Sequence, residues 1–281
     1  MEIVLAIICV IILVLGIRNC YELRNFEMTE YCVSSTKIKE EKEFLVLSDL
    51  HDNTYGKANS KLLKCINETG VDRVIIAGDM ITGKKECDWQ GTIYFLVELS
   101  KTHTIYYING NHEYRTKKEP EYYGNKFVEY KRKLESAGVV FIENNHIDLG
   151  EIRITGLEID AKYYKKIKKQ SIRKEEIVEL IGSVDENKYN VLVAHNPRYV
   201  KDYCKWNPDM VICGHFHGGM VRMPVLGGVI SPQFDILPKY SGGKYRVDDV
   251  EVVVSKGLGV HSIKIRLFNK PEVIKIKLQK L

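Results

Sequence analysis

The stretch Cys213-Gly214-His215-Phe216-His217-Gly218-Gly219 decides how the rest of the sequence is interpreted. It ends the apolar run Pro208–Cys213, which predicts a short buried strand leading into a tight loop. The two histidines then lie at the C-terminal end of a strand, which in an open α/β sheet is the edge where ligands bind. Glycines on both sides let the loop turn so that both imidazoles reach one site. The stretch therefore predicts metal binding, with a glycine-rich turn carrying two surface histidines as the alternative.

The same arrangement, an apolar strand followed at once by side chains that bind metals, recurs along the chain. Strands are predicted at Phe44–Leu47, Val74–Ala77, Ile105–Ile108 and Val191–Ala194. The polar residues that follow these strands and the Met210 strand are Asp49, His51, Asp79, Asn111, His112, His195, His215 and His217. Each alone is more often a turn or capping residue. Together they would be costly to desolvate at one sheet edge unless cations coordinated them.

The N-terminus carries an uninterrupted apolar run, Ile3–Ile17, which ends at Arg18. The run is shorter than the roughly 20 residues of a full membrane span, so a short anchor helix, a signal-peptide core and a buried helix all fit. We favour the anchor, because no small-x-small cleavage site follows and Arg18 can extend to the headgroup boundary. We therefore expect a membrane contact through residues 3–17.

The charges beside this run predict its orientation. No Lys or Arg precedes it, and the flank that follows carries Arg18, Arg24, Lys37, Lys39 and Lys42. Because Lys and Arg are enriched on the cytoplasmic side, we expect a single N-terminal anchor in the inner cell membrane and a cytoplasmic catalytic body. Seven cysteines, an odd number without framework spacing, fit a reducing compartment.

The body of the chain alternates strand-like and helix-like runs, which predicts an α/β fold. A charged amphipathic helix is expected from about Glu121 to Ala137, and half-buried strands at Val252–Val254, Ile263–Leu267 and Val273–Leu278. About 240 residues without a low-complexity linker or repeat suffice for one domain. The expected parts are an anchor at 1–20, a juxtamembrane segment at 21–43 and one domain at 44–281.

The net charge of +5 is mild and fits an anionic substrate or a membrane surface. Nucleic acid is not expected as a partner, because the sequence has no interleaved aromatic and basic residues and no groove-reading motif. The basic run Lys162–Lys174 has two interpretations, a solvated helix face or a surface that gathers phosphates.

Five blocks of sequence, taken in order, resemble the calcineurin-like metallophosphoesterase superfamily. The blocks are Asp49-x-His51, Gly78-Asp79, Gly110-Asn111-His112-Glu113, Ala194-His195 and Gly214-His215-x-His217-Gly218-Gly219. Further blocks resemble the membrane-anchored bacterial subgroup typified by YkuE and YaeI, which includes UDP-2,3-diacylglucosamine hydrolases. These are Arg222-Met223-Pro224, Ser231-Pro232-Gln233, Tyr240–Tyr245, Ser255–Gly259 and Pro271-Glu272. The resemblance implies a four-layer α/β/β/α sandwich from about Phe44 to the C-terminus.

The resemblance also implies two divalent metal ions. Asp49, His51 and His217 would hold one ion, Asn111, His195 and His215 would hold the other, and Asp79 would bridge them. Mixed carboxylate, amide and imidazole ligands suit Mn²⁺, which we favour, or Fe²⁺ or Zn²⁺. Two such ions lower the pKa of a water between them, and the resulting bridging hydroxide would attack phosphorus in line. By the same resemblance His112 is a catalytic residue that donates a proton to the leaving oxygen or stabilises the transition state.

The implied activity is hydrolysis of a phosphodiester or pyrophosphate in a lipid-linked or nucleotide-sugar substrate. The specific expectation is conversion of UDP-2,3-diacylglucosamine to UMP and lipid X, a step of lipid A synthesis. A cell-wall or other phosphoesterase is the first alternative, and a non-catalytic scaffold that retains the fold is the second. Arg222 either binds a substrate phosphate as a bidentate donor or supports the loop that carries His215 and His217.

Overall fold

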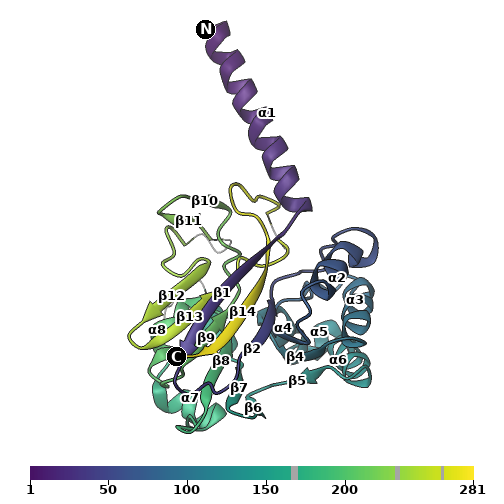
Figure 1. The fold of residues 1–281 in the computed structure, drawn as a ribbon. Helices are drawn as coiled ribbons and strands as arrows, with labels where there is room; N and C mark the ends of the chain where they lie inside the picture. The colour runs from purple at the N-terminus through teal and green to yellow at the C-terminus, as the bar shows by residue number, and fades with distance from the viewer. Residues whose placement is uncertain (166–169, 232–234, 261–262) are drawn as a thin grey trace.

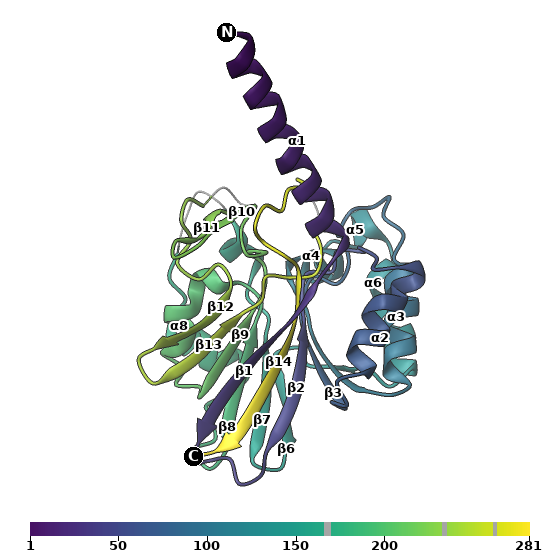
Figure 2. The same ribbon diagram turned by 45° about the horizontal axis from the view of Figure 1, so that its top comes forward.

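Two six-stranded sheets form the centre of the molecule in the computed structural model, which describes residues 1–165, 170–231, 235–260 and 263–281 (Figures 1 and 2). The first sheet has the strand order β1-β14-β2-β3-β4-β5, and its strands are β1 (Glu27–Ser35), β14 (Glu272–Lys280), β2 (Lys42–Leu47), β3 (Arg73–Ala77), β4 (Thr104–Ile108) and β5 (Val140–Phe141). The second has the order β12-β13-β9-β8-β7-β6, with β12 (Gly243–Val247), β13 (Val250–Val254), β9 (Met210–Cys213), β8 (Tyr189–Ala194), β7 (Ile152–Leu157) and β6 (Asn145–Leu149). A separate hairpin consists of β10 (Val221–Met223) and β11 (Gly227–Ile230).

Parallel pairing explains why the central strands are apolar on both faces. β2, β3, β4 and β5 pair in parallel in the first sheet, and β7, β8, β9 and β13 do so in the second. In β2, Leu45 packs toward the helices while Val46 packs toward the other sheet, and both are fully buried. A strand covered on both sides needs a continuous apolar sequence rather than an alternating one.

Three apolar cores separate four layers. One core lies between the first sheet and the helices α2 (Ser60–Asn67), α3 (Gln90–Ser100) and α6 (Lys126–Ser136). A second core lies between the two sheets, and a third lies between the second sheet and the helices α7 (Lys174–Ile181) and α8 (Val200–Cys204). This arrangement confirms the expected α/β/β/α sandwich.

Two local predictions are wrong. The helix expected over Glu121–Ala137 is two helices, α5 (Pro120–Tyr123) and α6, because Gly124 takes a left-handed conformation (φ 63°) between them. The expected strand Ile263–Leu267 is also absent, since within the described residues 263–267 only Leu267 forms a bridge, to Val221. The backbone of this segment instead binds the N-terminal helix: the amide of Arg266 donates to Asn19 Oδ1 (2.7 Å).

The basic run Lys162–Lys174 is interrupted rather than one helix in its described part. A 3-10 turn spans Ala161–Tyr164 and α7 begins at Lys174. Residues 166–169 of the basic run lie outside the described residues, and so do residues 232–234 of the block that begins at Ser231.

The N-terminal helix α1 (Glu2–Arg24) projects from one end of the sandwich (Figures 1 and 2). It is long and apolar enough to cross a membrane, with a mean hydropathy of 2.7 and none of that window buried. Its last turns contact the body. Glu22 is fully buried and accepts a hydrogen bond from the Asn269 amide (2.8 Å), while Asn19 donates to the Lys264 carbonyl (3.1 Å). The helix is therefore attached to the body by side-chain contacts as well as by the chain itself.

Candidate metal centre

Polar side chains from both sheets meet where the parallel strands end. Asp49 and His51 follow β2, Asp79 follows β3, and His112 lies at the start of α4 (Asn111–Lys118) directly after β4. His195 follows β8 in the second sheet, and His215 and His217 follow β9. All these Asp and His residues are buried. The predicted carboxyl edge of the sheet is therefore where the structure brings the predicted site residues together.

The backbone carrying these side chains is strained. Left-handed φ angles occur at five of them, namely Asp49 (53°), His51 (48°), Asp79 (56°), His215 (69°) and His217 (52°). Such conformations cost about 1–3 kcal/mol each for residues with a side chain and cluster at functional sites. The glycines make room for them: a Cβ on Gly214 would collide with the Asp49 carboxylate. The fold holds these loops in a shape that a structural role alone does not require.

Asp79 occupies the middle of the cluster. Its Oδ2 lies 3.1 Å from His195 Nε2, 3.7 Å from His51 Nε2 and 3.9 Å from His112 Nε2. Its Oδ1 accepts a hydrogen bond from the His112 amide (2.8 Å) at the first turn of α4. One carboxylate oxygen thus faces imidazoles from both sheets, as the predicted bridging role requires.

Asp49 faces a second set of imidazoles. Its Oδ1 lies 3.4 Å from His217 Nε2, 3.7 Å from His195 Nε2 and 3.9 Å from His51 Nε2. Among the described residues, three groups of side chains have ligand atoms mutually within 4.8 Å, close enough to hold metal ions: Asp49–His51–His217, His51–Asp79–His112 and Asp79–His195–His215. The clusters can hold divalent metals; the division of ligands between two ions remains a prediction.

The hydrogen bonds of two histidines direct lone pairs at the carboxylates. Nδ1 of His195 lies 2.6 Å from the Ala77 carbonyl and Nδ1 of His217 lies 2.8 Å from the Gly259 carbonyl, so both Nδ1 atoms are donors. In the neutral rings Nε2 is then an acceptor that faces carboxylate oxygens. A cation satisfies such a buried arrangement, either a proton on His195 Nε2 in the protein alone or a bound metal ion in its place.

Asn111 supplies a further unsatisfied acceptor. Its Oδ1 is buried and has no hydrogen-bond partner among the described residues. Buried amide oxygens without partners are rare, and a metal ion is one of the groups that satisfies them. The donor set of carboxylates, imidazoles and this amide oxygen therefore fits divalent cations.

The pKa values of several acids and histidines in this cluster are shifted by burial and by one another. Burial raises the pKa of Asp49 to about 6, against an opposing effect of His195. Burial opposes the charged form of His195, but the carboxylates of Asp79 and Asp49 raise its pKa to about 10. Burial and the charge on His195 hold the pKa of His215 well below its usual value. A proton on His195 thus compensates buried acids, so metal binding should release protons as the cation takes over this compensation.

His112 is held with a defined tautomer. The Gly83 amide donates to its Nδ1 (2.7 Å), so the proton of the neutral ring lies on Nε2, which faces Asp79. This arrangement suits a proton donor. The role of His112 as a catalytic residue rather than a ligand remains a prediction, because it also belongs to one of the three groups of suitable ligand atoms.

The side chain of Arg222 contacts backbone carbonyls of the loops around the site. Its Nη2 donates to the Gly242 carbonyl (2.7 Å), and its Nη1 lies 3.4 Å from the Gly218 carbonyl. Both contacts favour support of the loop that follows His217. The alternative of substrate phosphate binding remains a prediction.

Glu113 is a positioning residue to which the sequence interpretation gave no role. Its carboxylate accepts hydrogen bonds from the amides of Asp79 (2.9 Å), Met80 (2.8 Å) and Gly110 (3.0 Å) and from the Tyr107 hydroxyl (2.8 Å). The residue is fully buried, and burial together with the negative charge of Asp79 raises its pKa to about 7. The available signal was a glutamate three residues after Gly110, the spacing of a capping box.

We expect Glu113→Gln to lower the free energy of unfolding by about 2–3 kcal/mol, because an NH₂ group would replace an oxygen that accepts from amides. Chemical denaturation of the full chain in detergent measures this. Glu119→Gln, at an exposed position just after the same helix, is the matched control and should change stability by less than about 0.5 kcal/mol. Equal effects of the two substitutions would contradict the assigned role.

Asn269 was also missed, because it lies in a tail segment without a recognisable pattern. The side chain is buried and its Nδ2 donates to the carbonyls of His217 (2.6 Å) and Gly219. Its backbone amide donates to the Glu22 carboxylate of α1. Asn269 thus connects the N-terminal helix to the loop that carries His217.

Asn269→Ala should weaken metal binding about 10- to 100-fold, the usual effect of removing a group that orients a ligand. Calorimetric titration of metal-free protein with Mn²⁺ measures it. Asn67→Ala, at an exposed position in α2, is the control and should leave affinity unchanged. If Asn269→Ala lowered thermal stability but left the Mn²⁺ affinity unchanged, Asn269 would have only a structural role.

Comparisons with known proteins agree with this geometry. A family model described as calcineurin-like phosphoesterase matches residues 42–219. The chain is 26% identical to the uncharacterized metallophosphoesterase YkoQ of Bacillus subtilis, over 82% of this chain and 80% of that protein. It is 25% identical to an Aquifex aeolicus metallophosphoesterase, over 94% and 96%, and 22% identical to YkuE of Bacillus subtilis, over 92% and 87%. A Staphylococcus aureus structure provisionally assigned as a 5′-nucleotidase matches with a TM-score of 0.50 and 14% identity, over 78% of this chain and 49% of that one, a likeness of fold alone.

Proposed function

We propose, because the chain belongs to the calcineurin-like phosphoesterase family, that the protein hydrolyses a phosphodiester or pyrophosphate bond of a lipid-linked substrate. In this proposal α1 anchors the protein in a membrane. The leading specific substrate is UDP-2,3-diacylglucosamine, cleaved to UMP and the lipid monophosphate. Two divalent ions, Mn²⁺ by preference, are the expected cofactors.

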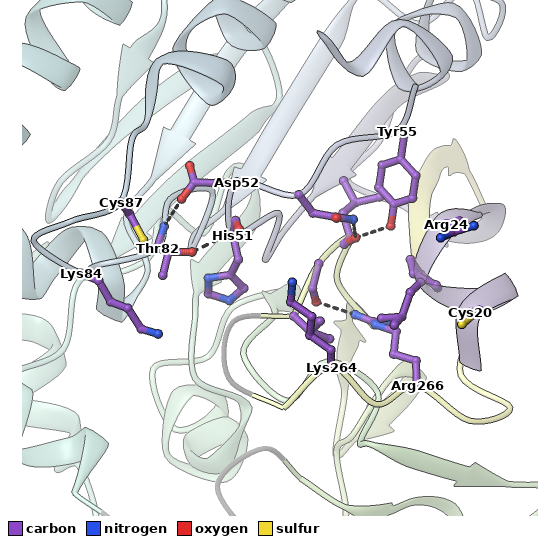
Figure 3. Close-up of a pocket in the computed structure, with 16 residues that line it drawn as sticks. Cys20, Arg24, His51, Asp52, Tyr55, Thr82, Lys84, Cys87, Lys264 and Arg266 are labelled. Atoms are coloured by element: carbon purple, nitrogen blue, oxygen red, sulfur yellow. Dashed lines mark hydrogen bonds between the residues drawn. The ribbon is translucent and has the colours of Figure 1, made fainter. Parts of the chain in front are cut away.

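A cavity that joins the site to the anchor helix carries this proposal. It has a volume of about 490 Å³ and is lined by His51 at one end and by Cys20, Leu23 and Arg24 of α1 at the other (Figure 3). An opening between a phosphoesterase site and a helix of membrane-spanning length suits a substrate whose reactive group is polar and whose tail is apolar.

Basic side chains give this cavity the charge that phosphates need. Arg24, Lys84 and Lys264 line it with their charged groups, as Figure 3 shows around the central space. Lys84 lies on the side of Thr82 and His51, whereas Lys264 and Arg24 lie toward α1. Cations on both sides of the space would bind an anionic headgroup and raise its local concentration.

The residues of the site can divide the chemistry among themselves. Bound divalent ions would supply Lewis acidity at the phosphoryl group and acidify water there. Asp79 and Asp49 hold the negative charge that such ions require, and the carbonyls of Ala77 and Gly259 orient His195 and His217. His112 presents Nε2–H beside Asp79 and gives its proton to the leaving oxygen.

Retention of α1 in the mature protein is supported by its contacts. Cleavage on the C-terminal side of Glu22 would remove its carboxylate and leave the Asn269 backbone amide without this acceptor. The basic residues that follow the apolar run favour a cytoplasmic body. Protease treatment of membrane vesicles tests the orientation: the body should be digested in inverted vesicles and protected in right-side-out ones, and the reverse pattern would refute it.

The test of the reaction is hydrolysis by detergent-purified, Mn²⁺-loaded protein of UDP-2,3-diacylglucosamine beside an aryl phosphodiester. We expect UMP and the lipid monophosphate as products, absent with Asp79→Asn. If the protein hydrolysed only the aryl diester, the phosphoesterase activity would stand and UDP-2,3-diacylglucosamine would be excluded as the substrate. No hydrolysis of either compound with metals bound would favour the scaffold.

A further inference from the structure

Exposed apolar side chains gather in the loops at the end of the molecule from which α1 leaves. The turn of the β10–β11 hairpin carries Val225 (105% exposed) and Leu226 (59%), and the neighbouring loops carry Ile236 (78%) and Phe268 (56%). In Figures 1 and 2 this hairpin and the loop before β14 lie beside the base of α1, and the C-terminus lies at the opposite end. We call the side chains of Val225, Leu226, Ile236, Leu237, Ile265 and Phe268 the apolar rim.

Contacts between neighbouring segments connect the apolar rim to α1. The guanidinium of Arg18 lies 5.5 Å from the centre of the Phe268 ring. The next residue toward the hairpin, Leu267, donates to the Met220 carbonyl (3.0 Å), and its own carbonyl accepts from the Arg222 amide (2.9 Å). On the far side of the hairpin, the Leu237 amide donates to Val229 (2.8 Å). The surface therefore runs from the anchor helix through the hairpin to the loop beyond it.

Hydrogen bonds hold this surface in one orientation relative to α1. Asn19 and Glu22 hold the segment 264–269 by hydrogen bonds of 2.7–3.1 Å, and that segment holds the hairpin. These contacts oppose independent rotation of the body about its anchor. When α1 crosses a bilayer, the end of the body that carries the apolar rim therefore meets the lipid surface.

We propose that the apolar rim inserts into the interfacial layer of the same bilayer that α1 crosses, which rests on the anchoring in the proposed function. Contiguous exposed apolar groups of this kind are rare on soluble monomers and mark contact surfaces. Groups of this size enter a bilayer by roughly 5–10 Å. The basic residues Lys239, Lys264 and Lys270 lie among them and suit anionic headgroups. The insertion places the cavity between α1 and His51 at the headgroup level, so that a lipid phosphoester reaches the site with its tail still in the bilayer.

Tryptophan fluorescence in nanodiscs tests this proposal. The two native tryptophans, Trp89 and Trp206, are buried (3% and 2% exposed) and give a constant background. Leu226→Trp and Phe268→Trp place probes on the apolar rim of the full chain. Val10→Trp within α1 is the positive control, and Leu281→Trp, 78% exposed at the opposite end, is the negative control. Each variant is measured in ordinary lipids, in lipids brominated near the glycerol end of the acyl chains, which reach the apolar rim, and in lipids brominated near their methyl end, which reach position 10.

We expect bromine to quench the probes at 226, 268 and 10 and to leave the probe at 281 unchanged. If the probe at 10 were quenched and the probes at 226 and 268 were not, the anchor would stand but insertion of the apolar rim would be refuted. No quenching at 10 would overturn both. A blue shift of the 226 probe that grows with protein concentration in detergent, without quenching in nanodiscs, would assign the surface to a second copy of the chain and also overturn the proposal. The readout does not use turnover, so failure of the phosphoesterase assay leaves it interpretable.

Discussion

Asp79→Asn is expected to abolish hydrolysis and metal loading together. The substitution retains the oxygen that accepts from the His112 amide but removes the negative charge that faces His195 and His51. Losing about 4 kcal/mol of electrostatic stabilisation corresponds to a roughly 10³-fold lower rate. The measurement is metal content by mass spectrometry alongside the rate on an aryl phosphodiester.

Asp249→Asn is the matched control, because Asp249 is fully exposed and pairs with Arg246 at the surface. It should retain both metal and activity. Full metal occupancy in Asp79→Asn would show that Asp79 does not hold the ions. Full activity in that variant would exclude the cluster as the active site.

His112→Ala should reduce turnover by roughly 10²- to 10⁴-fold, the usual contribution of a general acid, while the metals remain bound. The reason is geometric: Gly83 fixes the imidazole with its Nε2 proton beside Asp79, and alanine supplies no proton. The pH dependence of kcat is the second readout. The limb on which activity falls as the acid loses its proton should disappear in the variant.

His103→Ala is the control for this substitution, since His103 is nearly as buried but its ring contacts Thr102 away from the cluster. It should change turnover by less than about twofold, apart from any loss of folded protein. Loss of both ions in His112→Ala would make His112 a ligand and overturn the assigned role.

The sequence predicted the sheet edges because parallel strands buried on both faces are continuous apolar runs, as at Phe44–Leu47 and Val191–Ala194. The polar residue directly after each run was therefore placed at the right edge without knowledge of the strand order. The meeting of two sheets at that edge depends on packing between strands far apart in sequence, and it came from the family resemblance rather than from periodicity.

The sequence could not show the residues that position the site from a distance. Asn269 holds the His217 loop from just beyond the predicted strand Ile263–Leu267, in a segment whose backbone bonds go to α1 and the hairpin. Glu22 falls within the expected juxtamembrane segment 21–43, and no pattern distinguished it, yet it is fully buried. The contacts of Asn269 with His217 and Glu22 join residues 52 and 247 positions apart, and no local pattern encodes them. The break at Gly124 was visible as a glycine, but its left-handed conformation was not.

Reconstitution of the metal-free protein tests the central claim most directly. The protein is stripped with a chelator and titrated with Mn²⁺ while hydrolysis of an aryl phosphodiester is followed. The account predicts no activity without metal and a rise that saturates at two equivalents per chain, as two ions in the clusters around Asp49 and Asp79 require. Equal hydrolysis by the stripped protein, or two bound equivalents without hydrolysis of any phosphodiester or pyrophosphate, would contradict it.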